Sequence, residues 1–425
     1  MRYPDSLNGW LELLEGRHSA QIQLGLERVA HVRDALAVRC DAVVITVGGT
    51  NGKGSTCAML EAILLAAGYR VGCYTSPHLL RFNERVRIDG RELEDAALVE
   101  GFAAVERVRD EIPLTYFEHG TLAAWYAFSR EPLDVIILEV GLGGRLDAVN
   151  AIEPDCAVVT GVAMDHMDYL GETREQIGFE KAGIFRAGRP AICSDPLAPV
   201  SLVAHAREIG ADLCLVGQDF GFSGDRTQWV WWSRGGVRRG GLAYPALRGA
   251  NQLLNASAAL MALEKLRDRI PVSMQAVRQG LMLVELPGRF QVLAGKPSVV
   301  LDVAHNPQAA GVLSENLSNM GFFPETWAVL GMLSDKDVEG VVRLIQERVD
   351  HWLLTGLPGP RGLTAEALAD RLRSVGVRGD VQCFKRPAEA FSVAQESAGE
   401  GDRIVVFGSF LTVADVLDAV RAARH

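Results

Sequence analysis

The stretch that decides the fold is Ala42-Val43-Val44-Ile45-Thr46-Val47 followed by Gly48-Gly49-Thr50-Asn51-Gly52-Lys53-Gly54-Ser55. The apolar, β-branched run predicts a buried strand, and the residues from Ser55 to Ala67 predict a helix. A glycine-rich loop between a strand and a helix can turn its backbone N–H groups toward phosphate, with help from the helix dipole and from Lys53. Val47 and Gly54 depart from the common form of this loop, G-x-x-x-x-G-K-[ST]. We expect a nucleotide site; an ordinary tight turn is the alternative.

The sequence around this loop predicts an α/β fold. From Asp41 onward, short β-branched runs alternate with longer helical stretches, which is typical of a mainly parallel sheet with helical crossovers. Val135 to Val140 and Ala157 to Thr160 are two such runs. The segment from Val216 to Tyr244 holds three tryptophans among Gly and Arg, which predicts antiparallel hairpins that cover the core. A ligand-stacking platform is the less favoured interpretation of these tryptophans.

A second α/β domain follows the first. Asn255 to Arg267 has a helical pattern, and Leu286-Pro287-Gly288-Arg289 breaks it before the next strand. Four further strands are expected at the following runs: Ser298 to Val303, Trp327 to Leu330, His351 to Thr355 and Arg403 to Phe407. We therefore expect an N-terminal P-loop domain over residues 1–287 and a smaller, Rossmann-like domain over residues 288–425.

Composition excludes several classes of protein. The 425 residues are 48% hydrophobic and 23% charged, with a formal net charge of −10, which is a globular composition. The apolar runs are far shorter than the roughly 20 residues that cross a bilayer, and no signal-peptide pattern opens the chain, so we expect a cytoplasmic protein. The seven cysteines are scattered and predict neither disulfides nor a zinc site. The acidic balance favours small-molecule substrates over nucleic acid or membrane.

Several polar residues stand where chemistry is expected. Glu139 follows the run Val135 to Leu138 and Asp302 follows Val299 to Leu301, so each places a carboxylate at the carboxyl end of a strand. Glu139 is a candidate Mg²⁺ ligand. His166 alone would suggest zinc or manganese, because Mg²⁺ prefers oxygen ligands, and a surface histidine is the alternative. Ser55 in the loop is a candidate hydroxyl ligand for phosphate or metal. For Ser55, as for Ser76, a helix cap is an equal alternative.

Taken together, the motifs resemble the folylpolyglutamate synthases and bifunctional dihydrofolate synthases of the Mur ligase superfamily. The resemblance runs over nearly the whole chain, and the departures in the phosphate loop are this family's own form. The first domain carries it in these strings: Leu24-Gly25-Leu26-Glu27-Arg28-Val29, Thr75-Ser76-Pro77-His78-Leu79, Arg81-Phe82-Asn83-Glu84-Arg85, Glu139 to Ala148, Asp165-His166-Met167-Asp168 and Glu180 to Phe185. The second domain adds these: Pro287-Gly288-Arg289, Asp302 to Pro307, Ser334-Asp335-Lys336-Asp337 and Gly408-Ser409-Phe410.

The resemblance implies an ATP-dependent ligase. The γ-phosphoryl group of ATP passes to a carboxylate, and the amine of L-glutamate attacks the acyl phosphate. Residues 1–287 then form a Mur-ligase-type ATP-binding domain and residues 288–425 a glutamate-ligase domain, with the active site in the cleft between them. Closure of such a cleft would exclude water from the acyl phosphate.

The resemblance also assigns roles to residues. The catalytic set is Lys53, Lys181, Asp302 and His305. The ATP-binding set is Gly49, Thr50, Asn51, Gly52, Lys53, Gly54, Ser55, Asn255, Arg289 and Asp302. The metal ligands are Ser55, Ser76, Glu139, His166 and Lys181, the last as a carbamate formed with carbon dioxide. The pterin-binding set is Thr115, Tyr116, Phe117, Glu118, Leu146, Asp147 and Ala148, although Tyr116 and Phe117 could equally be a core aromatic pair.

The implied cofactors are ATP and two Mg²⁺ ions, and the resemblance leaves room for a monovalent cation. The implied substrates are dihydropteroate, reduced folates and L-glutamate, and the implied state is a monomer. Three alternatives stay open: a folylpolyglutamate synthase alone, another amide ligase of the superfamily, and a regulatory protein that hydrolyses ATP without ligation. The last is disfavoured because a simple switch does not need the second domain's Asp302 and His305.

Overall fold

The computed structural model describes residues 3–17, 23–224, 228–249, 251–377 and 379–423. The chain divides into two compact units, one of residues 1–246 and 253–284 and the other of residues 247–252 and 285–425. Each is an α/β unit built on a mainly parallel sheet, so the predicted fold class is confirmed. Within the described residues, no helix is long and apolar enough to cross a membrane.

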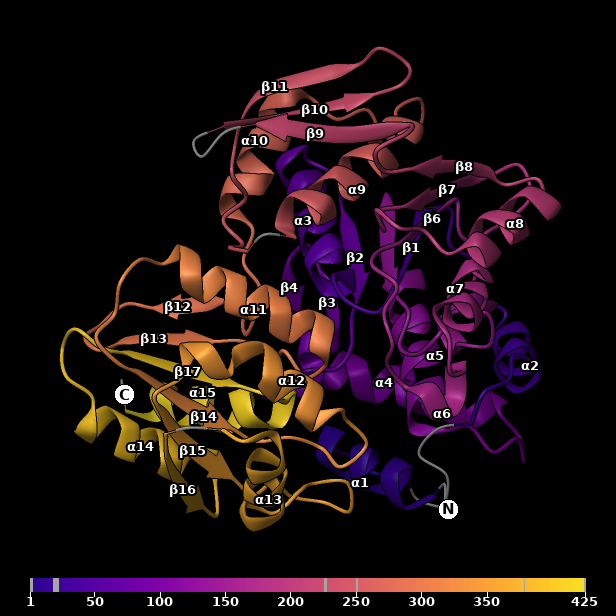
Figure 1. The fold of residues 1–425 in the computed structure, drawn as a ribbon. Coiled ribbons are helices and arrows are strands. Elements are labelled where there is room, and N and C mark those ends of the chain that lie inside the picture. Colours follow the sequence, from indigo (N-terminus) through magenta and orange to yellow (C-terminus); the bar gives the residue numbers. More distant parts are fainter. Residues whose placement is uncertain (1–2, 18–22, 225–227, 250, 378, 424–425) are drawn as a thin grey trace. The chain divides into compact units, whose positions relative to one another are not determined.

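The first unit is built on an eight-stranded sheet with the order β4-β3-β2-β5-β1-β6-β7-β8 (Figure 1). Its strands are β1 (Val43–Gly48), β2 (Val71–Tyr74), β3 (Val86–Ile88), β4 (Arg91–Glu92), β5 (Val135–Glu139), β6 (Cys156–Val159), β7 (Pro190–Cys193) and β8 (Asp212–Leu215). The six strands from β2 to β8 in this order are parallel, and β3 and β4 add an antiparallel edge. The two innermost strands, β5 and β1, are buried at every position, which is why their sequences are continuous apolar runs.

Helices surround this sheet. They are α1 (Leu7–Arg17), α2 (Glu27–Leu36), α3 (Lys53–Ala66), α4 (Asp95–Val108), α5 (Tyr116–Ser129), α6 (Met167–Leu170), α7 (Arg174–Ala182), α8 (Val200–Glu208), α9 (Gln252–Lys265) and α10 (Met274–Leu283). The short 3₁₀ helices η1 (Phe82–Arg85) and η2 (Ala148–Ala151) lie between them in sequence. Helix α3 follows β1 directly through the glycine-rich loop, as the sequence predicted.

The tryptophan-rich segment forms a separate antiparallel sheet. Its strands β9 (Phe220–Gly224), β10 (Gln228–Ser233) and β11 (Arg238–Ala243) lie over α9 and α10 in Figure 1. Trp229 and Trp231 are fully buried. The indole N–H of Trp231 donates to the Ser257 carbonyl at 3.2 Å and that of Trp229 to the Ala243 carbonyl at 2.9 Å. The interpretation of this segment as a cover is confirmed.

The second unit has a six-stranded sheet with the order β12-β13-β17-β14-β15-β16. Its strands are β12 (Gln291–Leu293), β13 (Ser298–Leu301), β14 (Thr326–Leu330), β15 (His351–Thr355), β16 (Asp380–Phe384) and β17 (Arg403–Phe407). All are parallel except β12. Its helices are α11 (Pro307–Asn319), α12 (Val338–Ile345), η3 (Gln346–Arg348), α13 (Ala365–Val375), α14 (Pro387–Ser397) and α15 (Phe410–Ala422). The expected strand at residues 298–303 ends at Leu301. Asp302 still donates its backbone N–H to the Val406 carbonyl, and its carboxylate accepts the backbone N–H of Ala304 in the turn that follows.

Candidate active site

The glycine-rich loop is fixed against the chain that follows β6. Thr50 N donates to the Gly161 carbonyl at 2.7 Å, and the Thr160 hydroxyl donates to the Asn51 carbonyl at 2.7 Å. Gly49 has a φ of 142°, and a Cβ there would lie 1.8 Å from Thr160 Oγ1. Only glycine allows this approach. The loop is therefore shaped by its tertiary partners as well as by its own sequence.

Polar side chains of the predicted ATP-binding set surround this loop. Lys53 Nζ donates to the Gly49 and Thr50 carbonyls at 3.1 and 3.3 Å, so the ammonium group lies over the loop. A Cβ on Gly52 would lie 2.4 Å from Asn255 Oδ1, which places the Asn255 side chain against the loop from α9. Ser55 is buried in the first turn of α3. The structure thus brings Lys53, Ser55 and Asn255 to the same loop.

Glu139 and Ser76 lie next to each other at the same edge of the sheet. Glu139 is the last residue of β5. It pairs in register with Val47, the next-to-last residue of β1, the strand that leads into the glycine-rich loop. Glu139 is 3% exposed as a whole residue, and its Oε2 accepts the backbone N–H of Ser76 at 3.0 Å. The carboxyl ends of β1, β5 and β2 meet at this edge, which is where open α/β sheets bind ligands.

Lys181 is a buried amine near the end of α7. Burial and, to a smaller extent, the charge of Lys53 together lower its pKa to about 7, against the opposing effects of Asp165 and Asp147. The neighbouring carboxylate, Glu180, is held by Arg145 at 2.8 Å. A lysine in this setting exists largely as a neutral amine above pH 7, and a neutral amine is nucleophilic.

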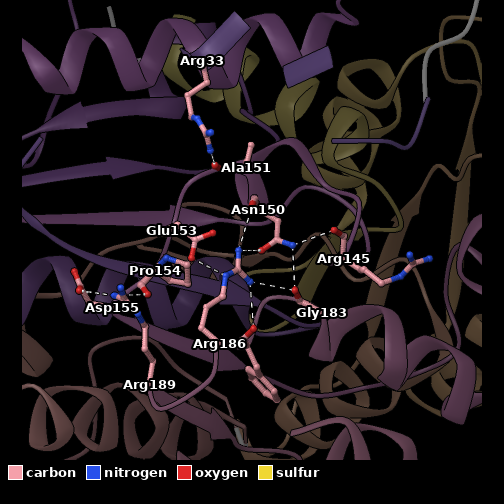
Figure 2. A network of polar contacts seen from close by, with 11 residues as sticks. Arg33, Arg145, Asn150, Ala151, Glu153, Pro154, Asp155, Gly183, Arg186 and Arg189 are labelled. Atoms are coloured by element: carbon pink, nitrogen blue, oxygen red, sulfur yellow. Dashed lines mark hydrogen bonds and ion pairs between the residues drawn. The ribbon is translucent and has the colours of Figure 1, made fainter. Parts of the chain in front are cut away.

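A polar network holds the turn after Lys181 in place (Figure 2). The Asn150 amide donates to the Arg145 and Gly183 carbonyls, both at 3.0 Å. Arg186 donates to the Asn150 side chain at 3.0 Å and to Glu153 at 2.8 Å. Gly183 leaves no room for a side chain, since a Cβ there would lie 2.3 Å from the Arg145 Cβ. The network fixes the end of α7 to the turn that carries Asp147.

His166 adopts a left-handed backbone conformation, with φ of 53° and ψ of 41°, immediately before α6. Its backbone N–H donates to Asp165 Oδ1 at 2.9 Å, and its imidazole Nε2 lies 3.9 Å from Asp165 Oδ2. Such a conformation costs free energy in a residue other than glycine and is frequent at functional sites. Asp165 is part of the family motif, yet no role was predicted for it; its influence on Lys181 is visible only in the fold.

The donors suit a hard cation. Glu139 offers a carboxylate and Ser55 and Ser76 offer hydroxyl groups, all of which are oxygen donors of the kind that Mg²⁺ prefers. Among the described residues, no group of three or more His, Cys, Asp and Glu side chains is arranged as a metal site. The predicted metal set contains only two such residues, Glu139 and His166, so it relies on hydroxyl groups and on Lys181 for its other ligands.

The predicted pterin residues have structural partners of their own. Thr115 caps α5 and accepts the Glu118 N–H at 3.2 Å, while Glu118 accepts the Thr115 N–H at 2.7 Å and pairs with Arg28 at 2.7 Å. Phe117 fills the space beside Gly141, where a Cβ would lie 2.5 Å from its ring. Tyr116 is half-buried, and burial raises its pKa to about 12.

The turn from Leu146 to Ala148 is equally well anchored. Leu146 accepts the backbone N–H of Gly25 at 3.3 Å, and Ala148 is buried at the start of η2. Asp147 is buried, and burial raises its pKa to about 6, although the N–H groups of Leu142 and Val149 hold the charged form.

One cluster beside these residues was quoted from the sequence without a role. His78 Nδ1 accepts the Arg85 Nε–H at 2.8 Å. Burial and the charge of Arg85 together lower the pKa of His78 to about 4. The guanidinium carbon of Arg85 lies 5.3 Å from the Phe82 ring centroid and 5.6 Å from that of Tyr116.

The second unit has its own group of polar residues at the carboxyl ends of β13 and β17. Asp302 accepts the backbone N–H groups of Phe290 and Ala304, both at 2.8 Å. Burial raises the pKa of Asp302, against the opposing charges of Arg289 and His305. His305 Nδ1 lies 2.8 Å from the Val303 carbonyl, and the Arg289 guanidinium lies 4.9 Å from the Phe410 ring centroid. The structure thus gathers Arg289, Asp302 and His305 within one unit.

Comparison with known proteins matches a Mur ligase domain in each of the two units. The Mur ligase middle domain matches residues 47–194, and the Mur ligase glutamate ligase domain matches residues 288–410. The dihydrofolate synthase/folylpolyglutamate synthase of Escherichia coli K12 is 45% identical over 419 residues, which cover 98% of this chain and 96% of that protein. The protein of the same name from Mycobacterium tuberculosis is 33% identical over 86% of this chain and 82% of its own length.

Solved structures give the same result. The structure of E. coli FolC in complex with DHPP and ADP matches with a TM-score of 0.94 and 44% identity, covering 100% of both chains. A bifunctional folylpolyglutamate synthase/dihydrofolate synthase with Mn, AMPPNP and L-glutamate bound matches with a TM-score of 0.91 and 45% identity, over 99% of this chain and 100% of that chain. This chain belongs to the dihydrofolate synthase/folylpolyglutamate synthase family of the Mur ligases.

Proposed function

We propose that this chain is an ATP-dependent ligase that adds L-glutamate to dihydropteroate, forming dihydrofolate, and to reduced folates, forming folylpolyglutamates. The observation that carries the proposal is the edge where β1, β5 and β2 end, because the phosphate loop, Lys53, Glu139 and Ser76 meet there. Relatives at about 45% identity carry both activities in their names, and their structures hold ADP, DHPP and L-glutamate.

The proposed chemistry proceeds in two steps. A carboxylate oxygen of the acceptor attacks the γ-phosphorus of ATP, so that ADP leaves and an acyl phosphate forms. The amine of L-glutamate then attacks the acyl carbon, phosphate leaves, and the nitrogen loses a proton as the amide forms. Phosphoryl transfer depends on positioning and on neutralisation of charge. The loop N–H groups and Lys53 would hold the β- and γ-phosphates for the first step.

The metal would be held by Glu139, Ser55, Ser76 and His166. Divalent cations neutralise phosphate charge and orient the transferring group. The oxygen donors at the β5 and α3 ends fit such an ion, and a relative's structure contains Mn with a nucleotide analogue. The number of ions and the presence of a monovalent cation stay predictions.

We infer that Lys181 is carbamylated. Its amine is buried and its pKa is lowered to about 7, which favours the neutral form that reacts with carbon dioxide. The product is an anion, and the cation Lys53 acts on the same position. Intact-mass measurement of protein kept in bicarbonate buffer should show a species heavier by one carbon dioxide, which Lys181→Arg should lack. A plain amine in a density map of the metal-loaded enzyme would contradict the inference.

The second unit would supply Arg289, Asp302 and His305 to the nucleotide and the reaction centre. Their mutual arrangement supports this, since a buried carboxylate lies among two basic side chains. The expectation that residues of both units act on one substrate pair stays a prediction.

Dihydrofolate synthase activity is the finer part of the proposal. Tyr116 and Phe117 are half-buried and lie beside Tyr74 and Gly141, so their rings remain candidates for contact with a pterin. Thr115 and Glu118 would contribute to pterin binding through the cap of α5, the helix that carries these rings. Leu146, Asp147 and Ala148 would contribute through the anchored turn that leads into η2.

Acceptor-dependent phosphate release tests the function. ATP and L-glutamate should release phosphate with dihydropteroate and, in a separate reaction, with tetrahydrofolate, and each acceptor should gain glutamate by mass spectrometry. Activity with tetrahydrofolate alone would remove the dihydrofolate synthase assignment. Phosphate release without any acceptor or glutamate would contradict ligation and favour a nucleotide-hydrolysing regulator.

A further inference from the structure

The chain from the end of β2 through β3 carries three arginines in close succession, Arg81, Arg85 and Arg87, and two of them are matched by acidic side chains. Arg81 pairs with Glu92. Arg87 pairs with Glu61 at 2.8 Å, and both of those side chains are largely buried. The guanidinium groups of Arg81 and Arg87 are thus neutralised within the protein.

Glu84, the acid nearest to Arg85 in sequence, is used elsewhere. Its carboxylate accepts the backbone N–H groups of Leu79, Leu80 and Arg81 at 2.7, 2.8 and 2.9 Å. These bonds close the turn that leads into η1 and leave the carboxylate directed at the backbone.

Arg85 has neutral partners instead. Its Nε–H donates to the lone pair of His78 Nδ1 at 2.8 Å, and its guanidinium lies over the rings of Phe82 and Tyr116. Within the ranges that the structure describes, no carboxylate lies within ion-pair distance of Arg85. The residue is half-buried, and a cation that is partly removed from water without a counter-charge is costly. An incoming anion would offset that cost.

The position of Arg85 suits a substrate of the ligase. Its carbonyl accepts the N–H of Thr75 at 2.9 Å, which fixes it at the carboxyl end of β2. Ser76 follows directly and bonds Glu139. In the sheet, β5 lies between β2 and β1, the strand that leads into the phosphate loop. At the usual spacing between strands, β2 and β1 are about 10 Å apart. Arg85 therefore lies at the edge that carries the phosphate loop, beside the aromatic ring of Tyr116.

We propose that Arg85 binds the carboxylate of the acceptor substrate, the group that the ligase activates, with the rings of Tyr116 and Phe82 beside the aromatic part of that substrate. This proposal rests on the proposed function, because an aryl carboxylate acceptor combines the two chemistries that the cluster offers. A planar guanidinium binds a carboxylate through two parallel hydrogen bonds, and a stacked arginine keeps its orientation. Arg85 thus determines specificity for the acceptor, a role that the family motifs did not assign to it.

Steady-state kinetics of Arg85→Gln and Arg85→Lys provide the first test. Loss of a charge-assisted hydrogen bond should raise the KM for dihydropteroate by about 10- to 100-fold in Arg85→Gln, and by less in Arg85→Lys. The KM for ATP should stay within about twofold, because the phosphate loop is separate. Arg81→Gln is the matched control, because the Arg81 side chain is 66% exposed and pairs with Glu92, and it should leave all three KM values unchanged. A rise confined to the KM for L-glutamate would overturn the proposal, since it would assign Arg85 to the other carboxylate.

Binding of a truncated ligand provides the second test and does not depend on turnover. Dihydropteroate and its analogue without the carboxyl group are titrated into wild type and Arg85→Gln in the presence of a non-hydrolysable ATP analogue. Wild type should bind dihydropteroate about 10- to 100-fold more tightly than the analogue without the carboxyl group. Arg85→Gln should bind these two ligands with equal affinity, and its affinity for the analogue without the carboxyl group should equal that of wild type. A preserved preference in Arg85→Gln would overturn the proposal. If wild type binds neither ligand, the proposed function fails instead, and the two failures are distinguishable.

Discussion

Lys181 carries a stability cost that depends on pH. Its folded-state pKa of about 7 lies below the ordinary value of 10.5, because the amine is buried and faces Lys53. The unfolded chain therefore binds more protons between pH 7 and pH 10.5, and stability rises with pH through this window. The cost is fully present below pH 7 and disappears above the unfolded value.

The variant Lys181→Met should remove this cost. In buffer free of carbon dioxide at pH 7, we expect unfolding to require about 2 to 5 kcal/mol more than in wild type, while ligase activity is lost. The stability difference should shrink toward pH 10.5. Urea denaturation at several pH values measures it, with Lys265→Met as a control that should gain no stability, since Lys265 pairs with Asp212 at 2.7 Å. A Lys181→Met protein less stable than wild type at pH 7 would contradict this account.

Asp302 should be needed for turnover more than for folding. Alanine would leave the N–H groups of Phe290 and Ala304 without their acceptor, so Asp302→Asn, which retains an oxygen, is the sharper variant. We expect the free energy of unfolding of Asp302→Asn to lie within about 2 kcal/mol of the wild-type value, and its kcat to fall by about 100-fold or more. Circular dichroism with denaturant and initial rates measure both. Unchanged turnover would exclude Asp302 from the reaction.

At the scale of the elements, the segment after β6 shapes the phosphate loop. The Thr160 hydroxyl lies 2.7 Å from the Asn51 carbonyl and 3.2 Å from the Gly48 carbonyl, and it donates to the nearer. The loop is thereby attached to the chain that follows β6, which is distant from it in sequence.

Thr160→Val keeps the shape of this side chain and removes the hydroxyl group. We expect a loss of about 1 to 2 kcal/mol in unfolding free energy and a rise of about tenfold in the KM for ATP, because the loop is no longer held. Thr355→Val is the control: Thr355 is also buried at a strand end, yet its hydroxyl makes only a 3.5 Å contact. An unaltered KM for ATP in Thr160→Val would show that the loop holds its shape alone.

The elements differ in how well sequence predicts them. The strand over residues 43–48 and helix α3 could be predicted, because a continuous apolar run and a glycine-rich turn are local signals. The contact between Thr160 and Asn51 could not, since the two residues are 109 positions apart. The same holds for Arg85: its lack of a carboxylate partner follows from where Glu61, Glu84 and Glu92 are bound, and pairing of charges across elements leaves no pattern in the sequence.

At the scale of the whole molecule, each of the two units follows its own sequence pattern. The units are not divided at a single position of the chain, because each consists of two segments. The segment from Leu247 to Gln252 belongs to the second unit, although α9 belongs to the first from Leu253 onward. Its Gly249 has a φ of 130° and lies against Asn316 of α11, where a Cβ would come within 2.8 Å of the amide. The contact of one short linker with a distant helix is not encoded by periodicity or composition, so the sequence predicted a boundary only near Pro287.

The central claim is that this chain activates a carboxylate by phosphorylation and then joins it to L-glutamate. Its most direct test uses dihydropteroate labelled with heavy oxygen in the carboxylate, with ATP and L-glutamate, and mass spectrometry of the released phosphate and of the pteridine product. We predict that one labelled oxygen appears in phosphate for each glutamate added, because the phosphate that leaves the acyl carbon takes one carboxylate oxygen with it. Unlabelled phosphate, or release of AMP in place of ADP, would contradict this chemistry.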